Sequence, residues 1–508
     1  MKRELPLYPV LLAIALLLSI VLPSGASPYA GLRLLIGFAL GALFVGAAAR
    51  LLFGDRDRAG AAATMVVLYA FKGMDWRYAL LILFALGLIV AERLAATRRP
   101  SRVPWALAGR GLNAVSVVVL IAVVLRSSGD GSLGPYLAAI QTEGPNALRG
   151  SQPAVAAPAS APDIFVIVLD GHARADKLDA IFGYDASPFL SELGTRGFEV
   201  ASASRSNYLL TSQSLPSLLN MSPIADLVDR EAAAASSSPY TYLIRPFASD
   251  SRVFRLYRSL GYEVIAISSG FEEVALRGAD RFVDTGQVNE LETRVLGNTA
   301  VAPAIQMIDA DWFAAQQRAR VVAVFDAAAE ISREPHARPR LVVAHVPSPH
   351  APIVFAADGS AVPMTDLANF FDDTFANRAL PREQALAQYA GQLAHVDQLA
   401  LAAIDDVLAG ASAPPIILVL SDHGSAAGVS WDDLNASDLD ERTANLFAAL
   451  TPGRPGIFPP DVTLVNVFGL LTASYFGRPY DPLPNTAYRW GDSTFPDVPI
   501  ALPTATTP

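Results

Sequence analysis

Two stretches of the sequence end a run of apolar residues in side chains that can bind a metal ion. Residues 163–172 read Asp-Ile-Phe-Val-Ile-Val-Leu-Asp-Gly-His, so Asp170 follows six apolar, mostly β-branched residues. Residues 415–424 read Pro-Ile-Ile-Leu-Val-Leu-Ser-Asp-His-Gly and deliver Asp422 and His423 in the same way. Carboxylate and imidazole groups suit zinc or manganese. Taken alone, residues 415–424 are explained by a turn that ends a strand. Two strands that both end in an acid favour a metal site instead.

A run of hydroxyl side chains precedes a predicted helix and offers a nucleophile. Residues 206–217 read Ser-Asn-Tyr-Leu-Leu-Thr-Ser-Gln-Ser-Leu-Pro-Ser, and residues 215–219 form the apolar helical run. A hydroxyl at the amino end of a helix lies in a positive field, which stabilises its alkoxide and an approaching anion. A bound metal would lower the pKa of that hydroxyl further. Taken alone, however, these residues fit an ordinary helix cap better.

Other histidines and one arginine are further candidates. His345 and His350 follow a third apolar strand in a proline-rich loop. There they would bind a second metal, contact oxygens of the transferred group or protonate a leaving group. His172 fits a metal contact and local packing equally, and His395 lies inside a predicted helix, where we expect a structural role. Arg174 either contacts an anionic substrate or bridges to a nearby acid.

Alternating strands and helices must position these residues. Apolar patterns between turn residues predict strands at 163–170, 262–267, 341–345 and 416–421. They predict helices at 187–196, 212–221, 253–260 and 381–408. Ser187 is the predicted cap of the first helix, with Pro188 at its first position. Such alternation predicts an α/β fold with a mostly parallel sheet and helices on both faces. Ligands bind outside the carboxyl ends of the strands in such sheets, which is where the acids fall.

The amino-terminal quarter of the chain has the composition of a membrane anchor. Apolar runs lie near residues 7–23, 31–53, 59–71, 78–91 and 112–125, and the third run is the least secure span. Several are shorter than the ~20 residues that a span usually needs. Arg50 and Arg126 would therefore extend their charges to the membrane surface.

Basic residues predict the orientation of this anchor, because short cytoplasmic loops are rich in Lys and Arg. Basic residues gather before the first span, between the second and third, and between the fourth and fifth, and these segments would be cytoplasmic. The residues are Lys2, Arg3, Arg50, Arg56, Arg58, Arg93, Arg98, Arg99, Arg102 and Arg110. Five crossings place everything after Arg126 outside the cytoplasm. The sequence thus divides into an anchor (1–126), a linker rich in Ala, Pro and Ser (127–162) and an extracytoplasmic catalytic domain (163–508).

Charge and cysteine usage exclude some functions. Residues 1–130 hold 14 Lys and Arg against 6 Asp and Glu, and the remainder holds 24 against 42, a formal net charge of −18. An acidic outer part argues against nucleic acid as a partner, because nucleic acid needs a basic face. The chain has no cysteine, which excludes zinc-thiolate sites and disulfides.

Several motifs together resemble a known family. They are Leu-Asp-Gly-His-Ala-Arg-Ala-Asp at 169–176, Gly-Tyr-Asp-Ala-Ser-Pro-Phe at 183–189, Ser-Asn-Tyr-Leu-Leu-Thr at 206–211, Leu-Ser-Asp-His-Gly at 420–424 and the tail near 466–484. From 163 to 499 the chain resembles the alkaline phosphatase and sulfatase superfamily. Within it, the chain is most similar to membrane-anchored proteins related to lipoteichoic acid synthases and lipid A phosphoethanolamine transferases.

The resemblance implies roles for individual residues. Thr211 resembles the transferase nucleophile and metal ligand, because residues 211–216 have the form Thr-x-x-Ser-x-Pro. Asp422 and His423 match the paired metal ligands of the Ser-Asp-His-Gly motif, and Asp170 matches an acidic ligand that is Glu in the transferases. His350 resembles a histidine that contacts substrate or a second metal.

Three features depart from the family pattern. His345 is a weaker match than His350 to the substrate-contacting histidine. Formylglycine sulfatases carry Cys-x-Pro-Ser-Arg or Ser-x-Pro-Ser-Arg, whereas here Leu218 replaces the arginine, which leaves an unmodified Ser214 as the alternative nucleophile. The transferases have a further histidine after the Asp-His pair, and this chain has none beyond His423.

These observations predict a metal-dependent enzyme anchored in the bacterial cytoplasmic membrane. It would transfer a phosphoryl-type group, of the phosphoethanolamine or phosphoglycerol class, through Thr211 to an envelope acceptor. The expected substrate is lipid-linked or an envelope glycan, and the expected metal is zinc or manganese, with calcium or magnesium as alternatives. A hydrolase of the same fold, acting as phosphodiesterase, phosphatase or sulfatase, is the alternative. An inactive ectodomain that binds the envelope is the alternative from another class.

Overall fold

The computed structural model describes residues 6–72, 75–95, 103–143, 161–228, 231, 240–364, 367, 370–375, 380–490 and 497–501. The basic residues Lys2, Arg3, Arg98, Arg99 and Arg102 and positions 144–160 of the predicted linker lie outside the described residues. The chain forms two compact units. The first consists of Met1–Gln141, Ser236–Tyr242 and Asn289–Ala310, and the second of Thr142–Ala235, Leu243–Val288 and Asp311–Pro508.

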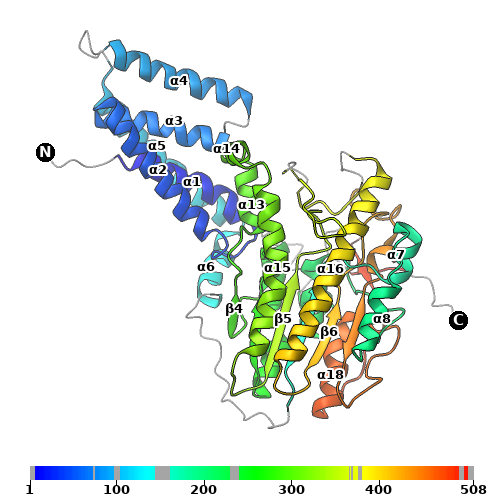
Figure 1. The fold of residues 1–508 in the computed structure, drawn as a ribbon. Helices are drawn as coiled ribbons and strands as arrows, with labels where there is room; N and C mark the ends of the chain where they lie inside the picture. The colour runs from blue at the N-terminus through cyan, green and yellow to red at the C-terminus, as the bar shows by residue number, and fades with distance from the viewer. Residues whose placement is uncertain are drawn as a thin grey trace. The chain divides into compact units, whose positions relative to one another are not determined.

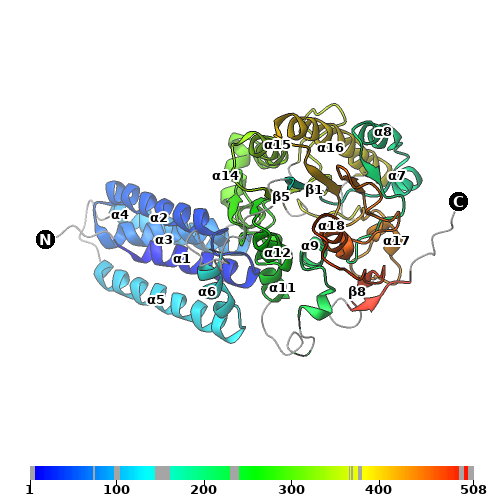
Figure 2. The ribbon, with the colours of Figure 1, turned by 90° about the horizontal axis from the view of Figure 1, so that it is seen from below.

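Each of the five predicted apolar runs forms a helix of the first unit (Figures 1 and 2). These helices are α1 (Tyr8–Val21), α2 (Leu32–Phe53), α3 (Arg56–Lys72), α4 (Trp76–Ala95) and α5 (Trp105–Gly129). Three segments are long and apolar enough to cross a membrane, by length and composition: Leu32–Phe53, Arg77–Ala95 and Trp105–Gly129. Large apolar side chains such as Phe44, Leu51 and Phe84 face outward from these helices. Apolar outward faces of this kind belong in lipid, and the chain is a membrane protein.

Three further helices belong to the first unit. They are α6 (Leu133–Thr142), α13 (Glu290–Gly297) and α14 (Val301–Ile308). The predicted linker is therefore not wholly irregular, because α5 extends to Gly129 and α6 follows it. Helices α13 and α14 lie within the predicted catalytic domain (163–508) in sequence, yet they pack within the first unit.

The second unit is built on a seven-stranded sheet in the order β2-β7-β6-β1-β5-β3-β4. The parallel strands are β1 (Ile164–Leu169), β3 (Glu263–Ile267), β4 (Arg281–Val283), β5 (Arg340–Val346) and β6 (Ile416–Leu420). Antiparallel β7 (Phe447–Leu450) pairs with β6, and β2 (Glu199–Val200) pairs with β7. The prediction of an α/β fold with a mostly parallel sheet is confirmed.

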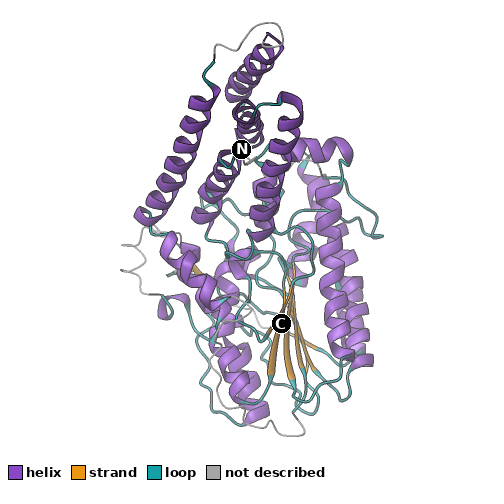
Figure 3. Ribbon diagram, turned by 90° about the vertical axis from the view of Figure 1, so that its left-hand side faces the viewer, coloured by secondary structure: helices purple, strands orange, loops and turns teal. Residues whose placement is uncertain are grey.

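Helices cover both faces of this sheet (Figures 2 and 3). Alternate residues of β1 point to opposite faces, so Phe165 and Ile167 enter one core and Val166 and Val168 the other. The first core receives α8 (Ser187–Thr195), α15 (Trp312–Arg333) and α16 (Arg382–Gly410). The second receives α9 (Thr211–Asn220), α12 (Arg252–Ser259) and α18 (Val467–Phe476). All of β1 is buried, which explains its unbroken apolar sequence.

The remaining elements are short or lie at the edges of this unit. They are α7 (Ala175–Phe182), α11 (Tyr240–Ser249), α17 (Leu439–Thr443), β8 (Tyr488–Arg489), β9 (Val498–Pro499) and brief 3-10 turns at 224–226, 272–274 and 464–466. One predicted detail is wrong: Ala186, not Ser187, is the cap of α8, so Ser187 and Pro188 are its first two residues. Proline tolerates either of the first two positions, where its missing N–H has no helical partner.

Candidate active site

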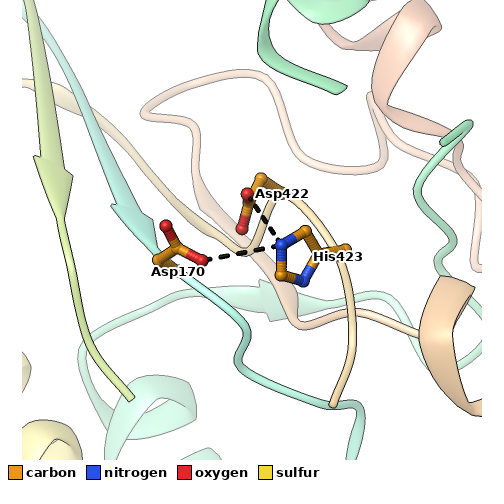
Figure 4. Close-up of side chains that lie close together, drawn as sticks. All are labelled: Asp170, Asp422 and His423. Atoms are coloured by element: carbon orange, nitrogen blue, oxygen red, sulfur yellow. Dashed lines mark ion pairs between the residues drawn. The ribbon is translucent and has the colours of Figure 1, made fainter. Parts of the chain in front are cut away.

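Three neighbouring parallel strands bring their carboxyl ends to one edge of the sheet. Because β1 lies between β5 and β6, Val168 is paired with His345 on one side and with Leu420 on the other. The residues that follow these positions therefore meet: Asp170 after β1, and Asp422 and His423 after β6 (Figure 4).

Asp170, Asp422 and His423 form a buried cluster with the composition of a metal site. One ligand atom from each lies within 4.8 Å of the others. His423 Nε2 is 3.3 Å from Asp422 Oδ2 and 3.6 Å from Asp170 Oδ1. All three side chains are at most 1% exposed. These distances leave room for one ion between the three groups.

The cluster presents two carboxylate oxygens that lack hydrogen-bond partners. Asp422 Oδ1 accepts from the Gly171 N–H at 3.2 Å and from the Ser421 hydroxyl at 3.4 Å. Asp422 Oδ2 and Asp170 Oδ1 have no hydrogen-bond donor in the part of the chain that the structure describes. A buried carboxylate oxygen without a partner is destabilising, and a cation would compensate it. The residues present therefore fit a divalent metal ion.

The protonation of His423 suits a metal ligand. Its Nδ1 lies 2.9 Å from the Gly424 carbonyl oxygen, which can only accept, so Nδ1 carries the proton. The lone pair of Nε2 is then directed at the two acids. Burial, and after it the positive charge of Arg442, lowers the pKa of His423. The imidazole is therefore neutral, as metal coordination requires.

Thr211 is the first residue of α9 and lies beside this cluster. Its Oγ1 is 3.2 Å from His423 Nε2, and the N–H groups at the start of α9 provide a positive field. Ser214, one turn further along, is buried and donates its hydroxyl hydrogen to the Tyr208 carbonyl oxygen. Of these two hydroxyls, the one on Thr211 therefore faces the candidate metal ligands.

His345 lies behind the cluster and holds one of its ligands. Its Nε2 donates to Asp170 Oδ2 at 3.0 Å, and its side chain is 3% exposed. Burial would raise the pKa of Asp170, but the charge of His350 and the hydrogen bond from His345 lower it below its ordinary value. Asp170 is therefore an ionised carboxylate, oriented by His345 and available to a metal.

His350 reaches the site from the loop after β5. Its Nδ1 lies 2.8 Å from the Ala351 carbonyl oxygen, and its Nε2 lies 3.6 Å from Asp373 Oδ2. Burial opposes a positive charge, but Asp170 and then Asp373 raise the pKa of His350 above its ordinary value. A protonated imidazole is therefore favoured close to the metal cluster.

Two functional candidates, Asp373 and Arg442, have no signal in the sequence. Arg442 of α17 is 2% exposed, and its Nη1 lies 2.7 Å from Asp373 Oδ2. Its Nη2 lies 3.2 Å from His423 Nε2. Burial would raise the pKa of Asp373, but Arg442 and then His350 lower it to about 2. Neither residue follows a strand or belongs to a spaced motif, so only the tertiary fold brings them to the site.

A small pocket opens beside the cluster. It encloses an empty volume of about 240 Å³, part of it open to solvent. His350, Asp373, Tyr389 and Arg442 contribute to its lining, together with Gly171. A protonated imidazole and a guanidinium suit a tetrahedral anion such as a phosphoryl or sulfuryl group.

Three other predicted candidates lie away from this pocket in internal contacts. Arg174 pairs with Asp176 at 2.6 Å and donates to the Ser204 carbonyl oxygen. His172 directs Nε2 at Asp397 at 2.9 Å and Nδ1 at the Ala173 carbonyl oxygen. His395 packs on the ring of Phe355. The structure thus brings Asp170, Thr211, Asp422 and His423 together, with His345 and His350 beside them.

The fold and the cluster define a class of α/β enzymes with a candidate metal centre at the strand ends, and comparison with known proteins identifies the family. The Sulfatase family matches residues 162–450, and the chain belongs to it. The chain is therefore a sulfatase-like enzyme, a hydrolase or transferase of the alkaline phosphatase superfamily. No curated protein matches the chain.

Solved structures with likeness to this chain are distant. The C-terminal periplasmic domain of EcEptC from Escherichia coli, in complex with zinc, is 15% identical, covers 62% of this chain and 82% of its own, and has a TM-score of 0.40. The integral membrane protein lipooligosaccharide phosphoethanolamine transferase A from Neisseria meningitidis is also 15% identical, covers 83% of both chains and has a TM-score of 0.36.

Proposed function

We propose that this protein transfers a phosphoryl-type group, of the phosphoethanolamine or phosphoglycerol class, from a lipid-linked donor to an envelope acceptor. The single observation that carries the proposal is the position of Thr211. Its hydroxyl lies at the amino end of α9, 3.2 Å from His423 Nε2 and beside two acids with unpartnered oxygens. An activated hydroxyl in a positive field is what covalent phosphoryl transfer needs.

The proposed site holds a divalent metal between Asp170, Thr211, Asp422 and His423, with zinc or manganese favoured by this ligand set. When bound, the metal would lower the pKa of the Thr211 hydroxyl and offset charge on the phosphoryl oxygens. His345 holds Asp170 in place, and Asp422 is held by the Gly171 N–H.

The reaction proceeds in two displacements at phosphorus. The Thr211 hydroxyl loses its proton to solvent, Oγ1 forms a bond to phosphorus, the bond from phosphorus to the donor oxygen breaks, and the departing oxygen takes a proton. His350, whose pKa is raised, is suited to give that proton. An acceptor hydroxyl then attacks the same phosphorus and loses its proton, and Thr211 leaves with its hydroxyl restored.

The proposed arrangement places this chemistry at a membrane. Residues 1–126 anchor the chain in the cytoplasmic membrane of a bacterium, 127–162 link the two parts, and 163–508 form the catalytic domain on the periplasmic side. With five spans, the segments rich in Lys and Arg all fall on the cytoplasmic side, which supports this orientation. Anchoring raises the effective concentration of the site near a lipid-linked donor.

A hydrolase of the same fold is the second candidate, because family membership by itself includes hydrolases. Water would then replace the acceptor hydroxyl in the second displacement. Formylglycine chemistry is not part of this alternative, since Ser214 is buried and hydrogen-bonded to Tyr208.

Intact mass of the full-length protein tests the proposal. The metal-loaded protein is incubated with phosphatidylethanolamine, phosphatidylglycerol or a simple phosphodiester, with Thr211→Ala and Thr211→Ser as matched variants. We expect an adduct on Thr211 that is absent in the alanine variant and retained at lower yield in the serine variant. Its mass identifies the transferred group, and an added acceptor distinguishes transfer from hydrolysis. An adduct that persists in Thr211→Ala would exclude this nucleophile.

A further inference from the structure

The helix α14 carries an exposed face that is entirely apolar. Its sequence, Val-Ala-Pro-Ala-Ile-Gln-Met-Ile, contains no charged residue. Its exposed positions are Pro303, Ala304, Met307 and Ile308, two neighbouring pairs four residues apart, which lie on the same side of the helix on successive turns. Met307 is 88% exposed and Ile308 is 90% exposed. Among the described residues outside α1–α5, no other large apolar side chain is as exposed.

The preceding helix fixes α14 to one end of the bundle. Leu291 and Val295 of α13 lie in a cluster with the carboxyl end of α1, the start of α2 and the carboxyl end of α3. This is the bundle end from which α6 follows α5, and α6 also exposes Leu137 and Ile140.

Polar contacts fix the same junction. Glu292 forms a two-point ion pair with Arg33 of α2, at 2.6 and 2.8 Å. Asn289 donates to the Ala30 carbonyl oxygen, and the Ala300 N–H donates to the Ala70 carbonyl oxygen at 2.8 Å. The contacts of Asn289 and Ala300 bracket α13, so the start of α14 cannot leave the bundle end without breaking them.

We propose that the apolar face of α14, with Leu137 and Ile140 of α6, inserts into the lipid leaflet on the side of the membrane that carries the catalytic unit. The contacts of α13 and Ala300 place the face at the bundle end where α1 and α3 finish and α2 begins. An uncharged helix at this level favours a lipid surface over an acidic soluble protein. The inference rests on the proposed membrane topology and adds an anchor point within the catalytic half of the sequence.

Because the chain has no cysteine, a spin label attached to one introduced cysteine reports on that position alone. Single variants Met307→Cys, Val200→Cys and Leu40→Cys are spin-labelled in the full-length protein and reconstituted in phosphatidylethanolamine and phosphatidylglycerol nanodiscs. Val200 is an exposed apolar residue of the second unit, and Leu40 is exposed in the middle of α2. Collision rates with oxygen, which enters lipid, and with a water-soluble nickel chelate report the surroundings of each label.

We expect the oxygen-to-nickel collision ratio at Met307 to exceed that at Val200 and to remain below that at Leu40. A ratio at Met307 equal to that at Val200, with Leu40 in lipid, would overturn the inference. Dipolar broadening at Met307 would instead identify a second copy of the chain as the occupant. A low ratio at Leu40 would overturn the topology itself. None of these outcomes depends on catalysis, so failure of the Thr211 adduct is a separate result.

A functional variant completes the test. Replacing Met307 and Ile308 together by Asp adds charge to the proposed lipid-facing side without touching the active site. We expect the KM for a lipid donor in nanodiscs to rise several-fold, while turnover of a water-soluble phosphodiester stays unchanged. Equal losses with both substrates would indicate damage to the fold and count against the inference.

Discussion

The two sides of the active site pocket are built in opposite ways. On the acidic side, Asp170 and Asp422 each direct an oxygen at the site for which the described residues supply no hydrogen-bond donor. On the opposite side, Asp373 Oδ2 lies 2.7 Å from Arg442 Nη1 and 3.6 Å from His350 Nε2, so one carboxylate faces two cationic groups and one positive charge remains in excess. The acidic side thus attracts a cation, whereas the other side carries an excess of positive charge that attracts an anion. This difference predicts that substitutions on the two sides separate metal binding from substrate binding.

The largest expected effect follows from Asp170→Asn. The amide keeps the shape of the carboxylate and can accept from His345, but it removes the charge of a proposed metal ligand. Loss of the metal removes several kcal/mol of transition-state stabilisation, and ~4 kcal/mol corresponds to about 10³-fold in rate. We also expect the metal-free variant to melt at a lower temperature than metal-free wild type, since the carboxylate that His350 and His345 stabilise in the folded protein loses its charge.

Metal content by mass spectrometry and melting curves in chelator measure these two effects. Asp179→Asn, which changes a surface acid on α7, is the control and should behave as wild type. An Asp170→Asn protein that retains a full equivalent of metal would show that the acidic side does not form the metal site.

Arg442→Gln is expected to have the next largest effect, on the other side of the pocket. Hydrogen bonds to charged groups contribute about 1.5–3 kcal/mol, so the KM should rise about 10–100-fold. Metal affinity should stay equal or increase, because a positive charge 3.2 Å from His423 Nε2 is removed. Steady-state kinetics and metal titration of the same sample give both values.

Arg174→Gln is the matched control for this prediction, because Arg174 is also a buried, ion-paired arginine. An unchanged KM is expected there. If Arg174→Gln raised the KM and Arg442→Gln did not, the anion would bind where the sequence first suggested, at Arg174.

The same contrast explains how far the sequence predicted the site. Asp170, Asp422 and His423 follow buried parallel strands, and adjacent strand ends must meet, so their proximity follows from local patterns. Thr211 among its neighbouring hydroxyls was singled out by resemblance to a motif. Arg442 and Asp373 lie in segments without periodicity, and their contact depends on how loops 424–446 and 370–375 fold over the strand ends. Nothing local in the sequence encodes such a contact.

Prediction of the fold from the sequence was limited in the same way. The long apolar strands β1, β3, β5 and β6 were predictable, whereas β2 and β4 have only two and three residues and β7 reads Phe-Ala-Ala-Leu, with weak strand propensity. The sequence analysis places no element between residues 268 and 340, where α13, α14 and α15 occur. The packing of α13 on the bundle depends on pairs such as Arg33 and Glu292, which are 259 residues apart.

His345 allows a finer test of the acidic side, because it contacts the proposed metal ligand Asp170 through Oδ2, the oxygen that already has a hydrogen-bond donor. His345→Ala removes the hydrogen bond that orients Asp170, and such supporting residues typically change metal affinity about 10–100-fold. His345→Gln can still donate to Asp170 Oδ2 and should recover part of the loss. Excess metal should restore the activity of both variants, which a role in folding alone would not allow. If excess metal restores nothing, His345 does not act through the metal site.

The smallest functional effect is expected for His172→Gln, because His172 lies just outside the proposed metal site. His172 is adjacent in sequence to the Asp170-Gly171 turn, yet its two nitrogens face Asp397 and the Ala173 carbonyl oxygen and not the pocket. Burial raises the pKa of Asp397, so the loss of a donor there is costly, and Gln supplies one replacement donor. We expect a loss of about 1–2 kcal/mol in the free energy of unfolding, with metal affinity and KM unchanged. Denaturant unfolding measures the free energy of unfolding, and metal titration measures the metal affinity. A large drop in metal affinity would extend the metal site to His172.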